Sequence, residues 1–196
     1  MSDERRRPTA ADLAAARGRA VPDVVAPGLR VLFCGINPSL YSAAVGHHFA
    51  RPGNRFWPTL HGAGFTDRRL SPFDDALLPG FGLGCTNLVP RATARADELT
   101  AGELRQGAER LRDLVRRLRP AWLAVLGVSA YRAAFDRPSA ATGPQPAAIG
   151  RTRVWLLPNP SGLNAHCQLP GLVAEYRRLR VADATRCIDP DAAHIG

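Results

Sequence analysis

Four short apolar runs, separated by segments with helical spacing, constrain the fold of this chain more than any other feature. They occupy residues 29–35, 82–89, 121–127 and 153–157. Glycine or proline bounds them, as is typical of buried strands. Between the second and third runs, Thr100 and Glu103 form a capping box that begins a helix, which Pro120 ends. This alternation predicts one α/β domain, a three-layer α/β/α sandwich with a short, largely parallel central sheet.

Weaker signals predict the remaining elements. Asn54 caps a short helix that continues to His61, a second helix spans 129–135, and an amphipathic helix includes 172–179. The segment 136–150 is rich in Pro, Ala and Gly and is predicted to be an irregular loop. We expect residues 1–26 to form a mobile basic arm outside the core, residues 27–182 the domain, and residues 183–196 a C-terminal tail.

Three of the predicted strands end in polar loops. Asn37 and Ser39 follow the first strand, Asn87 ends the second, and residues 159–166 follow the last. The carboxyl ends of parallel strands open at the same edge of a sheet, so loops that are distant in sequence converge there. We therefore expect the chemistry of this chain to lie in a crevice at that edge.

The charge of the chain favours a polyanionic partner. The formal net charge is +9, with 26 basic residues that are all arginine against 17 acidic ones. A compositional bias toward arginine explains why lysine is missing, but it does not explain a net positive charge. Guanidinium groups bind phosphates and stack on nucleic-acid bases. Without lysine, no side-chain amine exists for Schiff-base catalysis.

No sequence pattern indicates a metal site or another cofactor. The four cysteines are far apart, and the adjacent His47 and His48 point in different directions on any regular element. Cys34 and Cys85 lie in apolar runs and are predicted to be core residues in a reducing compartment. The N-terminal residues do not resemble a secretory signal, and no apolar stretch is long enough for a membrane span. We expect a cytoplasmic protein with no membrane partner.

From about residue 26 to residue 180 the chain resembles the mismatch-specific uracil-DNA and thymine-DNA glycosylases, a branch of the uracil-DNA glycosylase superfamily. Four motifs in the right order carry this resemblance: Gly35-Ile36-Asn37-Pro38, then 49–57 (FARPGNRFW), then Thr86-Asn87-Leu88-Val89 with Arg91, and finally Asn159-Pro160-Ser161-Gly162-Leu163. The resemblance implies an enzyme that removes uracil, or a related damaged base, from DNA. The iron-sulfur branch of the superfamily does not fit the scattered cysteines.

The resemblance implies a role for each loop of the crevice. Asn37 positions the attacking water, and its amide implies slower chemistry than the aspartate of the efficient uracil enzymes. The residues themselves, rather than the resemblance, add a second catalytic candidate: Asp97 is the carboxylate nearest the Asn87 loop in sequence, and a carboxylate activates water better than an amide. Five residues would bind the flipped base: Ile36, Ser39, Phe49, Asn87 and Asn159. For each, the alternative is an ordinary structural role, such as a turn, a helix cap or a core side chain.

The last loop matches the segment that enters the minor groove in the family. Its DNA-binding residues would be Ser161, Gly162, Leu163, Asn164 and His166, with Leu163 as the apolar wedge. Two positions depart from relatives. Ser39 stands where many carry glycine, and Ala165 stands near a position where some carry arginine, so the selectivity for thymine and for the opposite base stays open.

The combined interpretation is a monomeric, monofunctional DNA glycosylase that acts on double-stranded DNA with uracil mismatches, best on G·U, and leaves an abasic site. The lack of lysine supports this, because bifunctional glycosylases cleave the strand through an amine. Two alternatives remain. One is a nucleic-acid-binding protein of the same fold with weak or absent catalysis. The other is a small-molecule nucleotide enzyme, although the complete glycine-rich phosphate motifs are missing.

Overall fold

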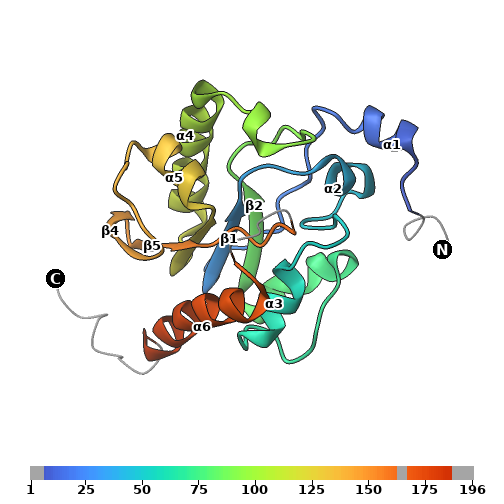
Figure 1. Ribbon diagram of the computed structural model, residues 1–196. Coiled ribbons are helices and arrows are strands. Elements are labelled where there is room, and N and C mark those ends of the chain that lie inside the picture. Colours follow the sequence, from blue (N-terminus) through green and yellow to red (C-terminus); the bar gives the residue numbers. More distant parts are fainter. Residues whose placement is uncertain (1–6, 163–166, 187–196) are drawn as a thin grey trace.

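A five-stranded sheet forms the centre of the protein (Figure 1). The computed structural model describes residues 7–162 and 167–186. The sheet has the order β2-β1-β3-β5-β4, and its strands are β1 (Val31–Gly35), β2 (Leu83–Asn87), β3 (Trp122–Leu126), β4 (Gly143–Ile149) and β5 (Thr152–Leu157). The first four strands in this order run parallel, and β4 is antiparallel to β5. This confirms the predicted α/β class with a largely parallel sheet.

Helices cover both faces of the sheet and complete three layers. On one face lie α4 (Ala101–Leu118) and α5 (Val128–Phe135), and on the other lie α3 (Phe56–Gly62) and α6 (Leu169–Arg186) (Figure 1). Successive residues of β1 point to opposite faces, so Phe33 packs with α3 and α6 whereas Leu32 packs with α4. Because both faces are covered, β1, β2 and β3 are buried along their full length.

The predicted helix starts and stops are confirmed with small shifts. The capping box of Thr100 and Glu103 is present, and α4 ends at Leu118, with Arg119 as its C-cap directly before Pro120. Asn54 accepts a hydrogen bond from the Phe56 amide at 2.9 Å, although Arg55 is the residue that precedes α3. The side chain of Arg91 donates to Glu103 at 2.7 Å, and this bond, together with those from Thr100, lowers the pKa of Glu103 to about 2. Arg91 thereby ties the loop after β2 to the first turn of α4.

The prediction of an irregular loop over residues 136–150 was wrong for its second half. Residues 143–149 form β4 at the edge of the sheet, with alternating burial and a register shift between Pro144 and Ala148. Proline cannot donate a hydrogen bond to a neighbouring strand and is tolerated at an edge. The Pro- and Ala-rich composition therefore resembles a loop, although residues 143–149 form an edge strand whose outward backbone groups pair with no other strand of the described residues.

The structure also corrects the expectation of an N-terminal arm outside the core, within the part that it describes. Helix α1 (Ala10–Ala15) leads into a segment in which Ala16 and Val21 are buried. Val24 then exchanges two backbone hydrogen bonds with Cys85 in β2, of 2.9 and 2.8 Å. This single bridge lies at the outer edge of β2 and pairs backbone groups there that would otherwise have no neighbouring strand.

At the other end, α6 continues past the predicted limit of the domain at residue 182. Asp183 is buried and receives a hydrogen bond from the guanidinium of Arg30, which precedes β1. The first residues of the predicted tail, 183–186, are therefore helical, and Asp183 is buried.

Three further short elements had no clear sequence signal: α2 (Leu40–Val45), η1 (Pro72–Phe81) and η2 (Ala96–Glu98). Cys34 and Cys85 are buried core residues, as predicted, whereas Cys187 lies outside the described residues. Within the part of the chain that the structure describes, no helix is both long and apolar enough to cross a membrane.

Candidate active site

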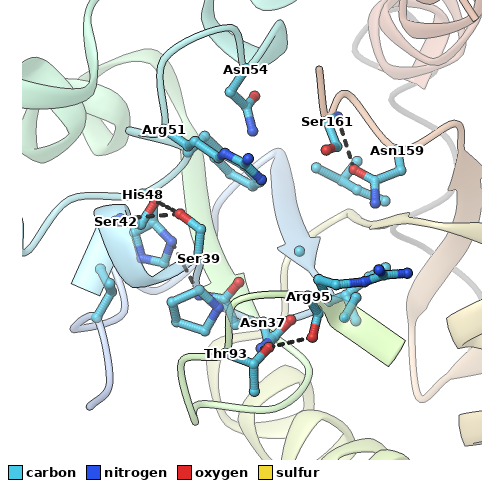
Figure 2. Close-up of a pocket in the computed structure, with 18 of the residues that line it drawn as sticks. Asn37, Ser39, Ser42, His48, Arg51, Asn54, Thr93, Arg95, Asn159 and Ser161 are labelled. Carbon is cyan, nitrogen blue, oxygen red and sulfur yellow. Dashed lines mark hydrogen bonds between the residues drawn. The ribbon is translucent and has the colours of Figure 1, made fainter. Parts of the chain in front are cut away.

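A cavity of about 770 Å³ opens at the carboxyl ends of β1, β2, β3 and β5 (Figure 2). The chain forms β1 and β2 side by side and then places β3 on the other side of β1, and such a reversal leaves a crevice beyond the strand ends. The predicted residues that line this cavity are Ile36, Asn37, Ser39, Phe49, Asn87, Asp97, Asn159 and Ser161. The structure thus brings together residues from four loops that are distant in sequence.

Asn37 is held with its amide group turned toward the loop after β2. Its Nδ2 donates to the carbonyl oxygen of Arg91 at 2.9 Å and to Oγ1 of Thr93 at 2.7 Å. Thr93 is buried, and its hydroxyl donates in turn to the carbonyl oxygen of Arg95 at 2.7 Å (Figure 2). Both bonds of Asn37 use Nδ2, so Oδ1 is the atom that can accept a hydrogen bond from a water. No donor to Oδ1 occurs among the described residues.

Phe49 presents an aromatic ring to the cavity from a strained backbone. Its φ is +55°, in the left-handed region that side chains other than glycine rarely adopt. The amides on either side of it are held: that of His48 donates to buried Asp75 at 3.1 Å, and that of Ala50 donates to Ser42 Oγ at 3.0 Å. One side of the ring stacks on Phe56, with centroids 4.0 Å apart. These contacts offset the backbone strain at Phe49 and hold its ring in one position.

His48 determines how the side chain of Asn87 is turned. The Nε2 atom of His48 lies 2.9 Å from the carbonyl oxygen of Pro22, which only accepts, so Nε2 carries the hydrogen. Burial lowers the pKa of His48 and keeps the ring neutral, so Nδ1 is an acceptor. Asn87 Nδ2 donates to Nδ1 at 3.4 Å, and its Oδ1 points the other way, over Gly35. The cavity thus contains a fixed carboxamide oxygen.

Ser39 and Asn159 use part of their polar groups in loop structure. Ser39 precedes α2, where its Oγ accepts a hydrogen bond from the Ser42 amide and donates to Ser42 Oγ, both at 3.1 Å. Asn159 Oδ1 accepts a hydrogen bond from the Ser161 amide at 3.0 Å (Figure 2). Gly162 lies against the main chain at Gly53, where an added Cβ would be 2.5 Å from the carbonyl oxygen. The contact between Gly162 and Gly53 brings the Asn159 loop against the loop before α3.

Among the described residues that line the cavity, three carry exposed charged side chains. Arg51 and Arg95 contribute guanidinium groups, and Asp97 is the single carboxylate among the residues that line it. Arg95 Nη2 donates to Asp97 Oδ2 at 2.6 Å, and the two side chains are 73% and 62% exposed. Asp97 therefore lies in the cavity wall, where it is solvated and paired with a cation.

Sequence reasoning missed the residues that hold the predicted ones in place. His48, Thr93 and Ser42 are buried polar side chains, and their partners come from distant segments. The pairing of His48 with Pro22 involves the segment that was expected to form a mobile arm. Of the predicted DNA-binding residues, Leu163, Asn164 and His166 lie outside the described residues, as does Ala165.

The fold and this strand-end cavity define an α/β protein whose site combines amide and aromatic side chains at the carboxyl edge of a parallel sheet. The family described as "Uracil DNA glycosylase superfamily" matches residues 22–180. The chain belongs to the uracil DNA glycosylase superfamily. In fold it is similar to a solution NMR structure described as a "putative Uracil DNA glycosylase" from Methanosarcina acetivorans. The TM-score is 0.55 at 18% identity, over 83% of this chain and 98% of that one.

Proposed function

We propose that this protein is a monofunctional DNA glycosylase that flips uracil out of double-stranded DNA and hydrolyses its N-glycosidic bond, with G·U mismatches as its best substrate. Membership of the superfamily supports action on uracil in DNA. The observation that carries the proposal is the convergence of Asn37, Phe49 and Asn87 in one cavity. The amide of Asn37 is bound at its nitrogen, the ring of Phe49 is fixed, and the oxygen of Asn87 is fixed.

Each of these groups suits one part of the reaction. Stacking of a flipped pyrimidine on Phe49 contributes about 1–3 kcal/mol. Oδ1 of Asn87 accepts a hydrogen bond from N3–H of uracil, whereas N3 of cytosine is itself an acceptor. Oδ1 of Asn37 accepts from a water, whose oxygen attacks C1′ while the bond between C1′ and N1 breaks. The bonding electrons leave on N1 of the base, and the attacking water releases its proton to bulk water.

The side chains available predict a slow enzyme. An amide such as Asn37 orients a water but does not take its proton at neutral pH. In the proposal, Asn159 lies beside the departing base, and its neutral amide stabilises the developing negative charge less than a charged side chain would. The loop that begins at Ser161 and Gly162 enters the minor groove, and the arginines supply the general attraction to phosphate.

Single-turnover incubation with oligonucleotides tests the proposal. The substrates contain G·U, A·U or G·T pairs or single-stranded uracil, and alkaline cleavage then reveals abasic sites. We expect product from G·U first and no strand cleavage before alkali, because the chain contains no lysine. If no substrate yields abasic product, the proposal is wrong. If the protein then still binds DNA in a salt-sensitive way, a nucleic-acid-binding protein of this fold is favoured. If it does not bind DNA, a small-molecule enzyme is favoured.

Asp97→Asn separates the two catalytic candidates. Because Asp97 is exposed and paired with Arg95, we expect the single-turnover rate on a G·U duplex to change by less than about threefold. A general base would instead contribute about 100-fold or more. The measurement is the maximal rate at saturating enzyme, with Asp113→Asn as the control, since Asp113 forms a similarly exposed pair with Arg116 on α4. A loss of about 100-fold at Asp97 alone would make it the general base.

A further inference from the structure

Arg55, the residue before α3, binds the main chain on both sides of residues 163–166. Its Nη2 donates to the carbonyl oxygen of Ser161 at 2.6 Å, and its Nη1 donates to the carbonyl oxygen of Cys167 at 2.8 Å. Its own amide donates to the carbonyl oxygen of Pro160 at 2.9 Å. One residue therefore holds the chain as it leaves the cavity wall and again where it leads into α6.

Two further contacts fix the same stretch of chain. Gly162 lies so close to Gly53 that an added Cβ would be 2.5 Å from its carbonyl oxygen. The side chain of Asn159 accepts a hydrogen bond from the Ser161 amide at 3.0 Å. The loop before α3 and the loop after β5 thus meet along their main chains, with the guanidinium of Arg55 bridging them.

We infer that Arg55 is a positioning residue for uracil removal: it holds Asn159 and Ser161 in the cavity wall and fixes the two flanks of the segment proposed to enter the minor groove. This inference rests on the proposed function. A guanidinium suits the task because its planar fork donates to two carbonyl oxygens at once, whereas a lysine ammonium is a single point of charge. Arg55 itself touches neither the water nor the base in this scheme.

Hydrogen exchange of the DNA-free protein tests the structural half of the inference. In Arg55→Ala we expect amides in the peptide 159–168 to exchange about tenfold faster than in the wild type, with the sheet unchanged. Arg177→Ala is the matched control. Its Nη2 also donates to a main-chain carbonyl, that of Gly62 at 2.8 Å, so it removes one arginine and one similar bond away from the cavity. Equal exchange of 159–168 in both variants overturns the inference.

Kinetics test the functional half. At saturating enzyme, we expect Arg55→Ala to remove uracil from a G·U duplex about tenfold or more slowly than Arg177→Ala. The affinities of the two variants for undamaged duplex should match, since each has lost one positive charge. Arg55→Lys should restore that affinity to the wild-type value but not the rate, because charge without the fork does not hold both carbonyls.

The outcomes separate this inference from the proposed function. Rates of the two alanine variants within about twofold of each other, or a full rescue of the rate by lysine, would overturn it. If Arg55→Ala does not fold, the lysine variant supplies both the exchange and the rate measurement. If the wild type removes no base from any uracil substrate, the proposed function fails, and hydrogen exchange still decides whether Arg55 holds the two flanks.

Discussion

Asn37→Ala is expected to slow single-turnover removal of uracil from a G·U duplex by about 100-fold, because it removes the oxygen proposed to hold the attacking water in position. The side chain is suited to this role by its surroundings. Arg91 and Thr93 both accept hydrogen bonds from Nδ2, which leaves Oδ1 for the water. The measurement is the maximal rate at saturating enzyme, so that weaker DNA binding does not contribute.

Thr93→Val is the control for this substitution. It removes the hydroxyl that accepts from Asn37 at 2.7 Å but keeps the shape of the side chain, and the bond from Asn37 to Arg91 remains. We expect a rate loss of less than about fivefold for Thr93→Val. If Asn37→Ala retains more than about a third of the wild-type rate, another group positions the water and the assignment of Asn37 is wrong.

The fold was largely predictable because its buried strands and capped helices leave strong local patterns. The apolar runs before Asn37 and after Pro120 correspond to β1 and β3, and the Thr100 box begins α4. The edge strand β4 was missed because half of its backbone groups need no partner and its prolines imitate a loop. The pairing of Val24 with Cys85 was missed because a single bridge between distant segments has no period in the sequence.

The sequence predicted the site residues at the strand ends, but not the residues that orient their side chains. Asn37 and Asn87 follow buried strands, and parallel topology brings such positions to one edge. Which way their amides turn depends on Thr93 and His48, which are close to them only after folding. Arg55 was visible only as part of a motif, because its carbonyl partners are more than a hundred residues away along the chain. Side-chain orientation is therefore the part of the site that required a structure.

Gly35→Ala is expected to slow uracil removal strongly while the protein still folds. An added Cβ at this position would be 2.7 Å from Oδ1 of Asn87 and 3.3 Å from Cε1 of Phe49. Neither side chain moves freely, because Asn87 is hydrogen bonded to His48 and Phe49 is stacked on Phe56. Losing a base contact worth about 1–3 kcal/mol slows removal by about 5- to 150-fold.

Gly80→Ala gives the matched control for this substitution. Gly80 lies in η1, and a Cβ added there has no heavy atom within 4 Å. We expect wild-type rates from Gly80→Ala, and from Gly35→Ala a slower rate with a folding stability reduced by about 1–3 kcal/mol through overpacking. Thermal unfolding and single-turnover rates measured on both variants separate the two effects. A normal rate in Gly35→Ala would show that base recognition does not depend on the positions of Asn87 and Phe49, and the assignment of both residues would fall with it.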